Sequence, residues 1–159
     1  PKYNSLRSGS HSIEGHSFYA KLMWTVSAPV QVLCTKKTKF NLNLNQYRNA
    51  HHYLLNDAKK DFAEIVKPRL RAACIPPLVQ IRMSFILYTR TATLCDVSNV
   101  CSIVDKFFSD CLTAEQIIPD DNRNHVLMVA YGFGGIDRVD PRVDVIIEDM
   151  AVSTQSTTA

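Results

Sequence analysis

The stretch DVSNVCSIVDKFFSD, residues 96–110, combines a regular apolar pattern with several polar side chains, and the interpretation of the rest of the chain depends on it. At about 100° per residue, its apolar side chains and those just after it fall on one continuous stripe of an α-helix. A helix with such a stripe docks on another element, which we expect to be a β-sheet. The stripe consists of Val100, Ile103, Val104, Phe107, Phe108, Cys111 and Leu112.

A second arc of the same helix is polar. Asn99, Lys106 and Asp110 lie within roughly 40° of each other around the axis, and Asp96 precedes the first turn, where a carboxylate is a favoured helix cap. Two interpretations are open. In one, Asp96 or Ser98 caps the helix, Lys106 pairs with Asp110, and the arc is solvated. In the other, the arc presents part of a functional site.

Two adjacent acids, Asp120 and Asp121, follow this helix after a short apolar link. If the chain runs back along the sheet, one of them approaches the start of the helix, near Asp96. Carboxylates gathered in this way repel each other unless a cation lies between them, and hard oxygen ligands suit Mg²⁺. The sequence therefore predicts a magnesium site near the beginning of the helix.

The flanking segments predict an α+β fold. Residues 47–67 have helical apolar spacing, with a possible helix cap at Asn45 and an end at Pro68. Glycines between the last two apolar runs favour a hairpin. The expected fold is a two-layer domain in which a small mixed β-sheet is packed by two main helices. The clearest strands are expected over 78–88, 125–131 and 143–149.

Composition narrows the class of protein. Residues 1–17 predict a flexible N-terminal arm or cloning remnant and 151–159 a disordered tail, leaving 18–150 as one domain. No apolar run approaches the roughly 20 residues of a membrane helix, and no clear secretory signal is present. Five scattered cysteines without a C-x-x-C pair favour free thiols in a reducing cytoplasm over a zinc site.

Charge is unevenly distributed along the chain. The net charge is +3, yet nine lysines and arginines lie between positions 36 and 71, and acids crowd residues 96–121. A basic part beside an acidic cluster suits a polyanion held against a bound metal, although an ordinary solvated surface has the same composition. The candidate phosphate contacts are Arg48, Lys59, Lys60, Arg82 and Arg90.

The pattern Asp96-x-x-Asn99, Lys106-x-x-x-Asp110-x-Leu112 and Ile118-x-Asp120-Asp121 resembles the core motif of the RusA-like Holliday junction resolvases, which are small phage and prophage endonucleases. The segment 45–48 is similar to the entry to that family's first helix. The resemblance covers residues 28–150, and it is specific over 96–122 and loose elsewhere. It implies a homodimeric, Mg²⁺-dependent enzyme that cuts four-way DNA junctions with paired nicks.

The resemblance also implies residue roles. Asp96 and Asp121 match two of the family's essential aspartates, Lys106 matches the essential lysine, and Asn99 matches the asparagine of the motif. The chain departs from the motif at Ser98, where the family has another aspartate. It also has four extra residues between Asn99 and Lys106, about one helical turn, which keeps the two on one face.

The missing carboxylate has several candidate replacements. Asp120, Asp110 and Asp105 are the acids within reach, and Asn99 and Ser98 are neutral alternatives.

The expected function is that of a structure-specific endodeoxyribonuclease in the cytoplasm of a bacterial host. Asp96, Asp121 and Asp120 would hold Mg²⁺ or Mn²⁺, which activates a water, and Lys106 would stabilise charge in the transition state. Asn99, Ser98 and Asp110 would support the site. A catalytically inactive protein that binds branched DNA is the alternative, and an interaction protein without a nucleic acid partner is a third interpretation.

Overall fold

The structure is a computed structural model that describes residues 22–34 and 38–150. The predictions for residues 1–17 and 151–159 lie outside the described residues. The elements, in chain order, are β1 (Met23–Pro29), β2 (Gln31–Cys34), β3 (Thr38–Asn41), α1 (Leu44–Asn49), α2 (His52–Ala72), β4 (Ile81–Thr89), α3 (Val97–Ala114), β5 (Val126–Ile136) and β6 (Arg142–Asp149).

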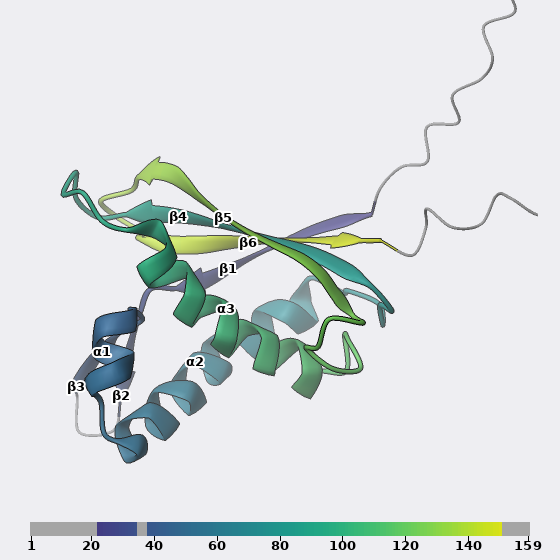
Figure 1. Ribbon diagram of the computed structural model, residues 1–159, viewed down its shortest axis with the longest axis horizontal. Coiled ribbons are helices and arrows are strands. Elements are labelled where there is room, and N and C mark those ends of the chain that lie inside the picture. Colours follow the sequence, from purple (N-terminus) through teal and green to yellow (C-terminus); the bar gives the residue numbers. More distant parts are fainter. Residues whose placement is uncertain (1–21, 35–37, 151–159) are drawn as a thin grey trace, which may run out of the picture.

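One mixed sheet organises the domain. Its strand order is β1-β6-β4-β5, and β2 and β3 form a separate two-stranded sheet. Strand β6 is antiparallel to both of its neighbours, whereas β5 is parallel to β4. Parallel strands need a long crossover, and α3 provides it. Figure 1 shows the helices on one side of the sheet, and no described helix covers the other side. The predicted α+β, two-layer architecture with a mixed sheet is confirmed.

The core lies between the sheet and the helices α2 and α3. In β4, the side chains of Ile81, Met83, Phe85 and Leu87 point into this layer and are buried, while the intervening side chains are half-buried on the other face. The rings of Phe85 and Phe108 meet edge to face, with their centroids 6.1 Å apart. The apolar stripe predicted for α3 is confirmed, because every member is buried except Val100, which is half-buried.

The predicted first helix is two helices. Asn43, rather than Asn45, caps α1 by accepting a hydrogen bond from the backbone N–H of Gln46 at 2.8 Å. The chain then breaks at residues 50–51, and α2 continues through Pro68 to Ala72. The prediction that Pro68 ends the helix is wrong. Buried side chains at four-residue spacing on both sides of the proline hold the helix against the core: Ala58, Phe62, Val66 and Leu70.

The hairpin predicted between the last two strands is also wrong, since β4 lies between β5 and β6. The three glycines taken as turn signals, Gly132, Gly134 and Gly135, lie inside β5 instead. A Cβ on Gly134 would lie 2.5 Å from Cζ of Tyr88 and 2.7 Å from Cγ2 of Ile86. Glycine is needed there because these β4 side chains lean across the neighbouring strand.

All five cysteines are free, and Cys101 and Cys111 are buried in α3. None of the helices in the described ranges is long and apolar enough to cross a membrane.

Candidate active site

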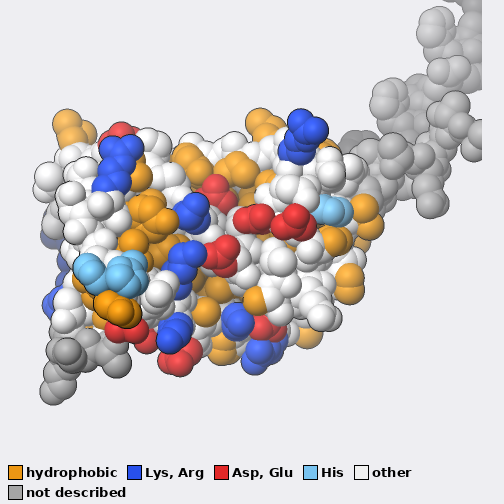
Figure 2. All heavy atoms as spheres, turned by 60° about the horizontal axis from the view of Figure 1, so that its bottom comes forward, with side chains coloured by type: hydrophobic (Ala, Val, Ile, Leu, Met, Phe, Trp, Pro, Cys, Tyr) orange, Lys and Arg blue, Asp and Glu red, His pale blue; other side chains and the backbone are white. Residues whose placement is uncertain are grey.

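A cavity of about 330 Å³ opens between the middle of α3 and the first half of β5. Three of its polar residues, Ser102, Asp105 and Ser109, stand on one face of α3, together with Lys106. Asp121 reaches the cavity from the turn after α3. Figure 2 looks at the helix side of the molecule, where acidic side chains gather near the centre with lysine and arginine side chains beside them. Val126 and Val129 of β5 complete the lining.

Asp105 is the anchored carboxylate of this cavity. The Tyr131 hydroxyl donates to its Oδ2 at 2.8 Å, and the Ser109 hydroxyl donates to its Oδ1 at 3.1 Å. Burial raises the pKa of Asp105, and the negative charge of Asp121 raises it further, while the two hydrogen bonds and the nearby Lys106 act in the opposite direction. Burial and the bond to Asp105 likewise raise the pKa of Tyr131, which therefore remains a hydrogen-bond donor. Asp105 is therefore a carboxylate whose negative charge is only partly offset by its hydrogen bonds and by Lys106.

The two adjacent acids of the turn have different surroundings. Asp120 accepts hydrogen bonds from the Asp121 backbone N–H at 2.9 Å and from the Asn122 side-chain amide at 2.6 Å. The Asn122 and backbone bonds lower the pKa of Asp120. Asp120 therefore stabilises the turn, and Asp121 is the acid that lines the cavity. This distinction does not support the predicted metal role of Asp120.

The donor set fits one divalent cation. Asp105 and Asp121 are carboxylates at one cavity, and Ser102 Oγ is a buried hydroxyl without a hydrogen-bond partner at the same place. The described part of the chain contains no group of three or more His, Cys, Asp or Glu side chains that could hold a metal. Mg²⁺ commonly uses one or two carboxylates and retains several waters, so two carboxylates with a hydroxyl suit it. Lys106 is exposed beside them and forms no ion pair with another described residue.

The structure does not bring Asp96, which was predicted as a metal ligand and catalytic residue, to this cavity. Asp96 caps α3, since its Oδ1 accepts from the Ser98 backbone N–H at 3.0 Å and from the Ser98 hydroxyl at 2.8 Å. Nine residues of helix separate Asp96 from Asp105, which is about 13 Å along the axis. Of the two candidate caps, Asp96 is the one that caps the helix, and neither Asp96 nor Ser98 lines the cavity.

Two other members of the predicted polar arc, Asn99 and Asp110, also lie outside the cavity and have other partners. Asn99 Oδ1 accepts from the Leu44 backbone N–H at 3.1 Å, so it fixes the start of α1. Asp110 pairs with Lys59 of α2, with 3.0 Å between Oδ2 and Nζ. The alternative Lys106–Asp110 pair is therefore wrong. Of the arc, only Lys106 lines the cavity.

The predicted phosphate contacts are dispersed over the molecule. Arg82 lies on the uncovered face of the sheet, with Nε 3.7 Å from Oε2 of Glu148. Lys59 is engaged by Asp110, and its Nζ lies 5.6 Å from the ring centroid of Phe107. Arg48 and Lys60 are exposed on α1 and α2. Arg90 lines a second, larger cavity near the start of α3.

Several cavity residues were not predicted, although the sequence carried a signal for most of them. Ser102, Asp105, Lys106 and Ser109 have the spacing i, i+3, i+4 and i+7, which places them on one helix face. Asp105 was named only as a replacement carboxylate. Tyr131 carried no local signal, because its role depends on β5 lying beside α3.

Comparison with known proteins does not assign the chain to a family. No family model matches it, and no curated protein matches it either.

Proposed function

We propose that the chain is a Mg²⁺-dependent, structure-specific endodeoxyribonuclease that cuts branched DNA, including four-way junctions, by phosphodiester hydrolysis. The observation that carries the proposal is the cavity lined by the anchored, half-buried carboxylate of Asp105 and by Asp121, with Lys106 alongside. Two carboxylates that line one cavity, with the charge of one raising the pKa of the other, fit a divalent cation and its phosphate ligand. The reaction class is the one implied by the sequence resemblance, but Asp105 takes the place expected for Asp96.

The side chains have distinct tasks in this proposal. Asp105 and Asp121 bind Mg²⁺, which when bound supplies Lewis acidity and neutralises phosphate charge. Tyr131 and Ser109 keep the Asp105 carboxylate ionised and oriented through their hydrogen bonds. Lys106 contacts the non-bridging oxygens of the scissile phosphate, where negative charge grows in the transition state. The Ser102 hydroxyl donates a hydrogen bond to a phosphate oxygen or to a water of the site.

A homodimer is part of the proposal, because paired cuts need two sites. Strand β5 is a sheet edge with no charged residue between Val126 and Ile136. Edge strands normally carry charges or other protection against pairing. Its large side chains are 38–56% exposed: Leu127, Met128, Val129, Tyr131, Phe133 and Ile136.

The opposite edge, β1, is protected. Arg69 Nη1 donates to the Ser27 carbonyl at 2.7 Å, and Pro29 has no N–H to offer. The contrast favours β5 as the edge that pairs with a second copy. Since Val126 and Val129 line the candidate active site, such pairing would bring the two sites close to the two-fold axis.

The test is nicking of a labelled four-way junction in Mg²⁺, with a linear duplex of the same sequence as substrate control. We expect Asp105→Asn and Asp121→Asn to lose at least about 100-fold in rate, as removal of a single electrostatic contact in an active site does. Asp96→Asn and Asp120→Asn serve as matched variants and should retain the parent rate, since asparagine also caps helices and turns.

Two results would count against this assignment. If Asp96→Asn is inactive while Asp105→Asn is fully active, the active site lies at the start of α3 and not at this cavity. Binding of the junction in EDTA, without nicking by the parent in Mg²⁺ or Mn²⁺, would favour the alternative of an inactive branched-DNA-binding protein.

A further inference from the structure

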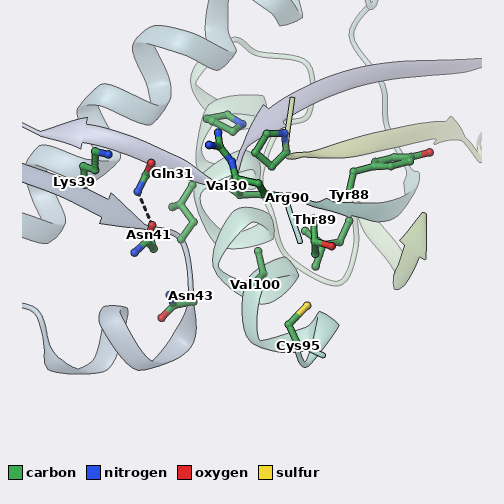
Figure 3. A pocket seen from close by; sticks show the side chains of 14 residues that line it. Val30, Gln31, Lys39, Asn41, Asn43, Tyr88, Thr89, Arg90, Cys95 and Val100 are labelled. Carbon is green, nitrogen blue, oxygen red and sulfur yellow. Dashed lines mark hydrogen bonds between the residues drawn. The ribbon is translucent and has the colours of Figure 1, made fainter. Parts of the chain in front are cut away.

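A second cavity of about 630 Å³ lies at the other end of α3, within the usual size range of ligand sites. Figure 3 shows its walls: Gln31, Lys39 and Asn41 of the small sheet stand on one side, and Thr89, Arg90 and Cys95 stand on the other, around the end of β4 and the start of α3. The nuclease proposal assigns no task to this space.

The cavity is positively charged. Lys39 and Arg90 both line it, and no Asp or Glu side chain is among its lining residues. Neither cation forms an ion pair within the described ranges, whereas Lys59, Arg71 and Arg142 elsewhere on the surface do. Two cations without a local counter-charge favour an anionic ligand.

The interior of the cavity is apolar. Leu42 and Leu87 are buried beneath it, and half-buried Val100 projects from α3. Above this floor, Gln31 Nε2 donates to Asn41 Oδ1 at 2.6 Å. That pairing leaves the Gln31 side-chain oxygen, the second Gln31 N–H and the Asn41 side-chain N–H groups available, the same kinds of group that recognise base edges. The ligand should therefore have an apolar, planar part as well as an anionic part.

We propose that this cavity binds one unpaired nucleotide of a branched DNA substrate, with the base on the apolar floor and the phosphate at Lys39 and Arg90. The proposal rests on the nuclease function, because α3 contributes both to this cavity and to the candidate active site. An unpaired base can leave its stack at low energetic cost and enter a pocket, whereas a base in an intact duplex cannot. The pocket thus supplies a preference for interrupted duplexes.

The experiment measures binding of a fluorescent single-stranded oligonucleotide and of a duplex by anisotropy in EDTA, over a series of salt concentrations. Removing both cations from the one bound phosphate with Lys39→Ala/Arg90→Ala should reduce the slope of log K against log salt by about 0.7 for the single strand, because each neutralised phosphate contributes about 0.7. The matched control is Lys67→Ala/Arg71→Ala, which removes the same charge from the far end of α2. The control variant should keep the parent's slope for the single strand, and the cavity variant should keep the parent's slope for the duplex.

Competition distinguishes a nucleotide site from a phosphate site. Deoxythymidine monophosphate should displace the oligonucleotide from the parent at a lower concentration than inorganic phosphate does, and this difference should disappear in Lys39→Ala/Arg90→Ala. Equal competition by the two anions would overturn the proposal, as would equal slopes for the parent and the cavity variant or an equal change in the control.

The outcome is separable from that of the nuclease proposal because no metal is required. If the salt slope changes in the cavity variant but the parent never nicks DNA, the nucleotide site is supported and the nuclease proposal is rejected. If nicking depends on Asp121 but the salt slope is the same in parent and cavity variant, the nuclease proposal is supported and the nucleotide site is rejected.

Discussion

Replacement of Gly134 by alanine tests how β5 fits against β4. The added Cβ would lie 2.5 Å from Cζ of Tyr88 and 2.7 Å from Cγ2 of Ile86, whereas carbon atoms normally meet at about 3.5–4.0 Å. The ring of Tyr88 cannot withdraw freely, because the Arg142 guanidinium lies 4.4 Å from its centroid and is itself held by carboxylates. Overpacking lowers the free energy of unfolding by about 1–3 kcal/mol, and replacing a strand glycine by alanine raises it by about 0.5–1 kcal/mol. We expect a net loss of about 1–2 kcal/mol.

Urea unfolding followed by circular dichroism measures this loss, and a fall in Tm of about 3–6 °C should accompany it. Gly132→Ala is the matched control, because its Cβ would meet only Cδ1 of Ile86, at 3.2 Å, the flexible end of that side chain. It should be close to neutral. Both should be measured at several protein concentrations, since β5 is also the proposed dimer edge. Equal stability of the two variants would refute the close approach of Tyr88 to β5.

Three further predictions concern the charges and the edge. The pKa of Asp105 is raised in the folded state, so its ionisation lowers stability as the pH rises above the ordinary aspartate range. Asp105→Asn should therefore be more stable than the parent at neutral pH in EDTA, and the difference in urea midpoints should shrink as the pH falls toward 3.8. The Lys59–Asp110 pair is 39% and 50% exposed, so a double-mutant cycle should give a coupling of about 0.2–1 kcal/mol that salt weakens, and Asp110→Asn should still nick DNA. Phe133→Lys should convert the proposed dimer to monomer in sedimentation experiments, because it places a charge on the apolar edge of β5, and a dimer that persists in this variant would exclude this edge.

The regular elements were predictable because each carries its own period. The α3 stripe repeats every three to four residues over the whole helix, and β4 alternates strictly, so local geometry alone assigns their buried faces. The hairpin prediction failed because the glycines taken as turn signals lie inside β5, where Gly134 makes room for side chains of β4. Which strand lies next to β6 depends on β4, whose sequence contains nothing about its neighbours.

The placement of the second carboxylate failed for a related reason. The turn after α3 is anchored at the beginning of β4, where the Leu78 N–H donates to the Ile117 carbonyl at 2.7 Å. A parallel β5 must start at that end of the sheet. Asp121 therefore stays near the C-terminal half of a helix that is about 27 Å long and cannot return to its beginning. The turn and the lysine singled out from the sequence both line the candidate cavity, and the direction of the next strand decides which acid of α3 they meet there.

The central position of β6 has a consequence for how the chain acquires its structure. β6 lies between β1 and β4, and it is the last of the described strands to leave the ribosome. Until it emerges, β1 has no partner in the main sheet, and the two helices have only half a surface on which to pack. Folding should therefore complete only after synthesis of residue 149, as a late event dominated by contacts distant in sequence. Nascent chains arrested just before β6 should remain sensitive to protease, and release of eight more residues should protect them.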